Sequence, residues 1–82
     1  MNSEIFKEIE KELIRAEKHG DKFASLHEAY AVILEELDEV WEITRLKRKL
    51  RSRPLLRSEF IQVAAMAIKA IESMDNFVGG KV

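Results

Sequence analysis

The sequence predicts an all-α protein with three helices in one domain. Its 82 residues are 46% apolar and 35% charged, with three glycines and one proline, a composition that favours helices over a β-sandwich or disorder. A chain of this length buries only about 60% of the surface that it exposes when unfolded, so residues 1–82 form a single domain. Because the chain has no cysteine, neither a disulfide nor a thiolate zinc site can stabilise its small core. Self-association is the remaining source of stability.

The first helix is expected over residues 2–18. Ile5, Ile9 and Leu13 recur at spacings of four and place an apolar stripe along one side of the helix. On the outer surface, acidic and basic residues three positions apart balance one another, so this face needs no partner. Gly20, which can adopt a left-handed conformation, predicts the end of the helix.

The second helix is expected over residues 26–50. Ser25 and Glu28 form a Ser-x-x-Glu capping box, in which each side chain pairs with a backbone N–H of the first turn. Pro54 marks the break after this helix, because proline and the residue before it disfavour helical geometry. A helical wheel gathers seven residues on the face expected to form the core: Tyr30, Ile33, Leu34, Leu37, Val40, Trp41 and Thr44.

The third helix is expected over residues 55–77, with a flexible tail at 79–82. It is apolar nearly all round, and its four alanines between residues 64 and 70 allow another backbone to approach closely. One such helix would leave apolar surface exposed in a three-helix monomer. We therefore expect a helical bundle with a second subunit, in a homodimer or homotetramer.

The amino-terminal segment and the hydropathy pattern predict a cytoplasmic protein that does not bind a membrane. No run approaches 18 apolar residues, which a membrane-spanning helix requires. The chain also opens with acidic residues, where a secretory signal needs basic and then apolar sequence.

Five carboxylates share a sector of about 120° on the second helix: Glu28, Glu35, Glu36, Glu39 and Glu42. No basic residue lies between Lys22 and Arg45, so like charges at neighbouring positions cost a few tenths of a kcal/mol per pair. One interpretation is a solvated acidic face. The other is a partly buried cluster that shares a divalent cation, which Val32 and Ile43 within the same sector favour.

Glu59 lies in an apolar stripe of the third helix, beside Val63, Met66 and Ala70. An unpaired carboxylate buried there would cost several kcal/mol, so Glu59 needs a partner. It is either stabilised by the helix dipole and by water in the first turn, or it is a metal ligand that faces the carboxylates of the second helix. Gln62, three residues on, offers an amide oxygen beside it.

A basic segment extends from Arg45 to Arg57, with seven lysines or arginines and no acid. Some of these charges compensate the dipole of the second helix or belong to a solvated turn. The surplus is suited to phosphate groups, and the acidic sector one or two turns earlier favours a nucleotide over a nucleic acid, whose backbone it would repel. The candidate phosphate-binding residues are Arg45, Lys47, Arg48 and Lys49.

Two motifs on the second and third helices resemble the signature of a known family. Glu35-Glu36-Leu37-Asp38-Glu39 is followed after nineteen residues by Glu59-Phe60-Ile61-Gln62. This arrangement resembles the E-E-x-x-E and E-x-x-D motifs of the MazG-type all-α nucleoside triphosphate pyrophosphohydrolases, over about residues 19–75. Gln62 stands where the family pattern has Asp; its amide can still bind a metal but cannot act as a general base.

The resemblance implies a house-cleaning hydrolase that converts an NTP or dNTP to the monophosphate and pyrophosphate. It implies Mg²⁺, or Mn²⁺, bound by the catalytic residues Glu35, Glu36, Glu39 and Glu59, with Gln62 as a further ligand. Two alternatives stay open at this point. The chain could be a non-catalytic helical interaction or nucleotide-sensing module, or a small nucleic-acid-associated protein that uses residues 45–57.

Overall fold

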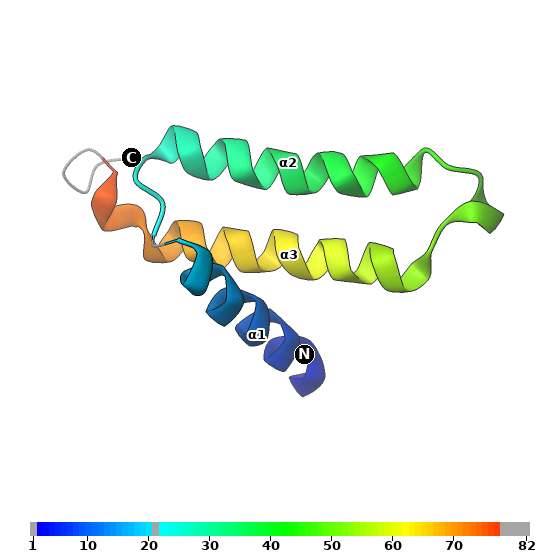
Figure 1. Ribbon diagram of the computed structural model, residues 1–82, viewed down its shortest axis with the longest axis horizontal. Coiled ribbons are helices and arrows are strands. Elements are labelled where there is room, and N and C mark those ends of the chain that lie inside the picture. Colours follow the sequence, from blue (N-terminus) through cyan, green and yellow to red (C-terminus); the bar gives the residue numbers. More distant parts are fainter. Residues whose placement is uncertain (1, 21, 78–82) are drawn as a thin grey trace.

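The computed structural model describes residues 2–20 and 22–77, and within them it confirms an all-α chain with three helices and no strand. Helix α1 spans Ser3–His19, α2 spans Leu26–Thr44 and α3 spans Arg53–Glu72, while short 3-10 turns occupy Arg48–Leu50 (η1) and Met74–Asn76 (η2). Helix α3 lies in the middle: α2 runs antiparallel along one side of it, and α1 crosses its other side obliquely (Figure 1). The expected tail, residues 79–82, lies outside the described residues.

The capping box at the start of α2 is confirmed. The Glu28 backbone N–H donates to Ser25 Oγ at 3.1 Å, and Glu28 Oε1 in turn accepts the backbone N–H of Ala24 at 3.3 Å. Helix α1 ends at His19 with Gly20 as its C-cap, as expected, but the left-handed conformation is wrong, because the φ of 166° and ψ of 154° of Gly20 are extended. Helix α1 therefore ends in a backbone conformation that does not require glycine.

Helix α2 ends at Thr44 instead of near residue 50. The chain turns extended at Lys47, with φ −58° and ψ 141°. Arg51 then reaches back and donates to the backbone oxygens of Thr44 at 2.6 Å and Leu46 at 3.1 Å. These bonds satisfy carbonyl groups that a continued helix would have paired, and the turn avoids stacking further like charges at helical spacing.

Helix α3 begins at Arg53, two residues earlier than expected, and ends at Glu72 instead of at residue 77, where the separate turn η2 follows. Ser52 is its N-cap, since the Ser52 hydroxyl oxygen accepts the backbone N–H of Leu55 at 3.2 Å. Pro54 therefore lies inside the first turn, where a missing N–H costs no helical hydrogen bond. The same proline that predicted a break after the second helix helps the third one to start.

The loop between α1 and α2 is held against the carboxyl-terminal end of α3. Ser73 is fully buried; its Oγ accepts the backbone N–H of Phe23 at 2.9 Å and donates to the Lys69 carbonyl at 2.6 Å. Asn76 Nδ2 also donates to the Phe23 carbonyl at 3.1 Å. The core is continuous with this contact and contains six buried residues: Ile9, Phe23, Ala29, Ala65, Met66 and Phe77.

The expectation for the core face of α2 is wrong in part: Ile33 and Val40 are half-buried, but most of the expected residues are exposed. The side that packs toward the core carries Ala29, Val32 and Ile33, together with the half-buried Glu36. Because α2 has apolar residues on both sides, its hydrophobic pattern does not decide which side packs on α3. Four residues of the expected core face are 41–67% exposed in the single chain: Tyr30, Leu34, Leu37 and Trp41.

The exposed stripe of α2 continues onto α3, where Ile71 is 68% exposed. Helical periodicity places Ala67 and Ile71 on the side of α3 next to that stripe. We call Tyr30, Leu34, Leu37, Trp41 and Ile71 the apolar face. None of the described helices combines the length and the apolar character that a membrane span needs.

Candidate metal centre

Three carboxylates from α2 and α3 meet between the two helices. Glu36 and Glu39 lie one turn apart on α2, and Glu59 lies in the second turn of α3. One oxygen of each carboxylate lies within 4.8 Å of the others. The antiparallel packing of α2 on α3 creates this arrangement, because it sets the middle of one helix beside the start of the other (Figure 1). We call these three residues the carboxylate cluster.

The cluster lacks internal charge compensation. Glu36 Oε2 and Glu59 Oε2 are both shielded from solvent and have no hydrogen-bond partner. No salt bridge of the described residues reaches Glu36, Glu39 or Glu59. Buried carboxylate oxygens are normally paired with donors or cations, and leaving one unpaired costs free energy. The geometry therefore leaves at least two acceptor oxygens for a proton or a cation.

Mutual repulsion and burial alter the acidity of the cluster. The neighbouring Glu39 carboxylate, followed by loss of hydration and by the charge of Glu36, raises the pKa of Glu59 from 4.5 to about 7. Burial, followed by the charge of Glu39, also raises the pKa of Glu36. In both residues the charged form is disfavoured, so a proton is held where a metal cation could replace it.

The structure separates the five residues that the sequence predicted as metal ligands. Glu36, Glu39 and Glu59 converge. Glu35 is exposed and is not part of the cluster, because adjacent helical positions point about 100° apart. Gln62 is half-buried and borders the cluster: together with Glu36 and Met66 it lines a cavity of about 210 Å³.

Two cations and one further carboxylate on this cavity were not singled out from the sequence. Arg15 and Glu12 of α1 line it and form a salt bridge with each other. Lys69 of α3 also lines it, and its Nζ lies 4.5 Å from the centre of the Phe23 ring. Arg15 and Lys69 are thus engaged with other groups, although they add positive potential beside the cluster. Periodicity could not have found Glu12 and Arg15, because they reach the cavity only through the crossing of α1 over α3. Lys69 lies seven residues after Gln62 on the same side of α3, so helical spacing could have indicated it.

The cluster has a donor set that suits a hard divalent cation. Mg²⁺ prefers oxygen ligands at about 2.1 Å, so two oxygens that share one ion lie no more than about 4.2 Å apart. The observed separation, within 4.8 Å, approaches that limit, and small side-chain rotations would close the difference. The two unpaired buried oxygens are the observation that fits a cation, since carboxylates gathered on an exposed surface would be satisfied by water.

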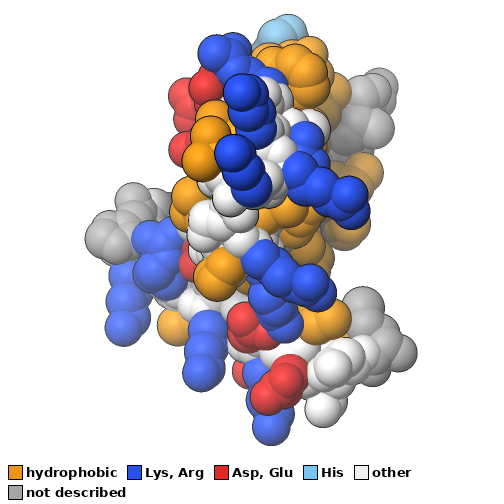
Figure 2. Space-filling view, turned by 90° about the vertical axis from the view of Figure 1, so that its right-hand side faces the viewer, with side chains coloured by type: hydrophobic (Ala, Val, Ile, Leu, Met, Phe, Trp, Pro, Cys, Tyr) orange, Lys and Arg blue, Asp and Glu red, His pale blue; other side chains and the backbone are white. Residues whose placement is uncertain are grey.

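The predicted phosphate-binding residues lie at the end of the α2–α3 pair, beyond the last turn of α2. Arg45, Lys47, Arg48 and Lys49 are all exposed, and many lysine and arginine side chains gather on this end of the molecule (Figure 2). Arg45 lies 3.9 Å from Glu42 in a surface salt bridge. Counting 1.5 Å per residue, Arg45 begins about 9 Å along α2 from Glu39. These cations are therefore near the cluster but do not contact it.

Comparisons with protein-family models, with curated proteins and with solved structures find no match to this chain. Its function must therefore be argued from the geometry of its own residues.

We expect Glu59 to make the metal-free protein less stable at alkaline than at acidic pH. Its folded-state pKa, about 7, lies above the ordinary value of 4.5, so the folded state holds the proton more tightly than the unfolded state does. This advantage is present below about pH 4.5 and is lost as the pH rises through 7. Glu59→Gln should remove the loss and gain on the order of 1 kcal/mol over wild type between pH 5 and pH 8, a figure reduced for solvent screening. Urea unfolding across this pH range, with a chelator present, measures the free energy of unfolding of both proteins.

The matched control is Asp38→Asn, which removes a carboxylate from an exposed position of α2 between Glu36 and Glu39. It should follow the wild-type pH dependence. An equal gain in both variants would show that general acidic repulsion, and not the burial of Glu59, causes the effect.

Proposed function

We propose that the chain is a Mg²⁺-dependent nucleoside triphosphate pyrophosphohydrolase that acts on an NTP or dNTP, with Mn²⁺ as an alternative metal. The observation that carries this proposal is the meeting of Glu36, Glu39 and Glu59 between α2 and α3, with two buried oxygens unpaired. These residues belong to the two motifs by which the sequence resembles MazG-type enzymes. Residues of the two motifs also meet in space. This contact supports the resemblance independently of how the motifs are spaced in the sequence.

In this proposal the members of the cluster divide the work according to their burial. Glu36 and Glu59, whose Oε2 atoms are shielded, would hold the cation. Glu39 is the exposed member, and we assign to it the orientation of a water molecule for attack at the α-phosphorus. When bound, the metal would supply positive charge that stabilises the phosphate oxygens in the transition state.

The remaining residues bind the substrate and the product. Gln62 can accept or donate a hydrogen bond beside Glu36, but it cannot take a proton from water, so general-base catalysis rests on a glutamate. The exposed cations after α2, Arg45, Lys47, Arg48 and Lys49, are assigned to the phosphate chain or to the leaving pyrophosphate. A substrate without phosphate would use neither these exposed cations nor the metal held by the carboxylate cluster.

We expect Mg²⁺ or Mn²⁺ at millimolar concentration to raise the melting temperature of the wild-type protein, because the ion binds the folded state preferentially. Glu36→Gln and Glu59→Gln should each abolish the rise, whereas the exposed control Asp38→Asn should retain it. Differential scanning fluorimetry measures the shift. Glu35→Gln distinguishes the resemblance from the geometry. The resemblance makes Glu35 a ligand, so the variant would lose the rise. The geometry leaves Glu35 outside the cluster, so the variant would keep it. No shift in the wild-type protein would identify the cluster as a solvated acidic face.

We expect slow release of pyrophosphate, and not orthophosphate, from at least one NTP or dNTP in the presence of Mg²⁺. Glu39→Gln should lower turnover about tenfold or more, on the scale of lost transition-state electrostatics. Gln62→Asp should raise metal affinity or turnover, since it adds a charge at the edge of the cluster. Anion-exchange analysis of the products across the eight common nucleotides measures both effects.

The same assay separates the two alternatives. Nucleotide binding with metal but no cleavage, even by Gln62→Asp, would support a non-catalytic nucleotide-sensing or interaction module. Binding of nucleic acid that weakens steeply with salt, without nucleotide binding, would support a nucleic-acid-associated protein instead.

The apolar face supports a homodimer or homotetramer as the working form. Tyr30, Trp41 and Ile71 are each more than half exposed in the single chain, and contiguous patches of this kind mark interaction sites. Pairing of α2 and α3 with the same helices of a second copy would form a four-helix bundle. By helical periodicity the apolar face and the cavity that Gln62 lines are on opposite sides of the α2–α3 pair, so the second copy would leave the cluster open.

We expect the wild-type protein to sediment as a dimer or tetramer at micromolar concentration. Leu37→Glu should shift it to the monomer, because the substitution places a charge in the centre of the apolar face. The control is Ile14→Glu, at a residue of α1 that is 50% exposed and outside this face. A wild-type protein that stays monomeric and binds no apolar dye would contradict the assembly.

A further inference from the structure

A second cavity, on a different side of α3 from the carboxylate cluster, lies where α1 and the α2–α3 linker approach the start of α3. It measures about 880 Å³, within the usual range of ligand pockets. Four arginines line it: Arg48 and Arg51 from the linker, and Arg53 and Arg57 from α3. The other lining residues are all apolar: Ile5, Ile9, Leu56, Phe60, Ile61 and Ala64. We call this cavity the arginine groove.

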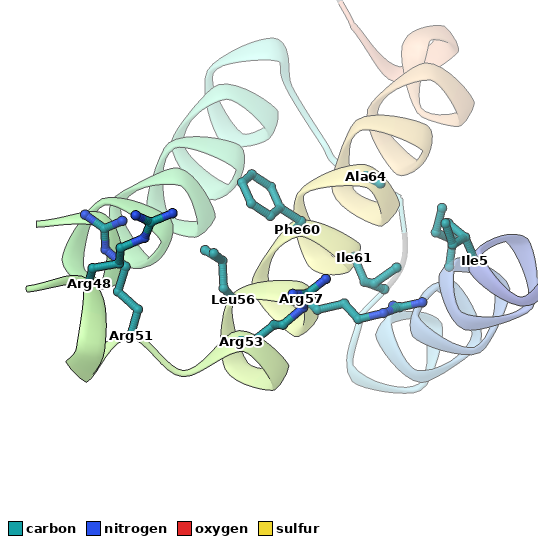
Figure 3. Close-up of a pocket in the computed structure, with 10 residues that line it drawn as sticks. Ile5, Arg48, Arg51, Arg53, Leu56, Arg57, Phe60, Ile61 and Ala64 are labelled. Atoms are coloured by element: carbon teal, nitrogen blue, oxygen red, sulfur yellow. The ribbon is translucent and has the colours of Figure 1, made fainter. Parts of the chain in front are cut away.

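The groove is separate from the proposed metal centre but borders the apolar face, since Phe60 lies eleven residues, or about 20° on a helical wheel, from Ile71. Phe60 lines the groove and Gln62 lines the cavity beside the cluster, and residues two apart on a helix point in nearly opposite directions. Figure 3 shows Arg48 and Arg51 together at the linker side of the groove, Ile5 of α1 at the far side, and Leu56 and Phe60 between them. The arrangement is a charged end that opens onto an apolar floor.

Two of the four guanidinium groups have no partner among residues 2–20 and 22–77. Arg57 is paired with Glu8 of α1, at 2.7 Å, and Arg51 is occupied by the backbone carbonyls that end α2. No hydrogen bond or salt bridge of Arg48 or Arg53 side chains is found in that part of the chain. Arg53 also begins α3, where the positive end of the helix dipole adds to its charge.

We propose that the arginine groove binds a free single-chain anionic amphiphile, with a phosphate or carboxylate head at Arg48 and Arg53 and an apolar chain along Leu56 and Phe60. Charge complementarity selects the anion, since no acidic residue lines the groove. The floor selects the apolar body: apart from the arginines it offers no polar side chain, so the polar edge of a nucleobase would stay unpaired there.

The proposal is tested by isothermal titration calorimetry of the full chain with decyl phosphate below its micelle concentration. Decyl maltoside carries the same chain without charge, and AMP carries the phosphate on a polar body. We expect saturable binding of one decyl phosphate per chain, at least about tenfold tighter than either comparison compound. Equal binding of decyl maltoside would overturn the role of the arginines, and tighter binding of AMP that the variant Arg48→Gln/Arg53→Gln loses would make the groove a nucleotide site instead.

Three variants locate the binding. The double variant Arg48→Gln/Arg53→Gln should weaken decyl phosphate binding about tenfold or more, whereas Lys49→Gln, on the same linker but outside the groove, should not. Glu8→Gln should strengthen binding several-fold, because it frees Arg57 from its salt bridge. Wild-type affinity in the double variant would overturn the proposal, and circular dichroism of each variant verifies that the helices are intact.

If an acidic amphipathic peptide or a phosphatidylglycerol vesicle binds through Arg48 and Arg53 while decyl phosphate does not, the groove is a docking site for a protein or a membrane, and the proposal is wrong. This result would leave the proposed metal centre untouched, since Glu36, Glu39 and Glu59 take no part in the groove; Arg48 alone belongs to both proposals.

Discussion

The packing of α2 against α3 brings three carboxylates together, two of them with an oxygen shielded from water, and the rest of the proposed chemistry depends on the repulsion among them. Ala29, Val32 and Ile43 are drawn toward the core, and Glu36 lies on the same side of α2. The free-energy cost of bringing these carboxylates together is offset in one of two ways. Either Glu59 keeps a proton near neutral pH, or a cation takes the place of that proton. Protons and metal thus compete for the same oxygens, so the site is most receptive to metal where the protein without metal is least stable.

Helix α3 supports two different surfaces because both of the other helices pack on it and barely on one another. On one side, α2 and the carboxyl-terminal half of α1 enclose the cavity beside the cluster, with Arg15 and Lys69 contributing positive charge. On the other, the amino-terminal half of α1 and the linker form the arginine groove. A small chain can present two sites of opposite charge in this way, because the body of α3 lies between them.

Part of the basic segment, residues 45–57, has a structural role, and cations remain that have none. Arg51 ends α2 by binding its last carbonyl groups, and Arg57 ties α3 to Glu8 of α1. These two arginines confirm that part of the segment compensates helix ends and surface charges. Of the five remaining cations, Arg48 and Arg53 border apolar surface, which is the basis of the proposed ligand site.

Local sequence determined the number of helices, the capping box at Ser25 and the presence of acids on one sector of α2, because these features depend on residues within a few positions of each other. Tertiary structure decided which side of α2 packs, since Trp41 and Val32 lie on different apolar sides and only α3 chooses between them. It also decided that Glu59 meets Glu36 and Glu39 while Glu35 does not. The arginine groove could not be predicted, because Ile5, Arg48 and Phe60 are far apart in the chain and become neighbours only when α1 crosses α3.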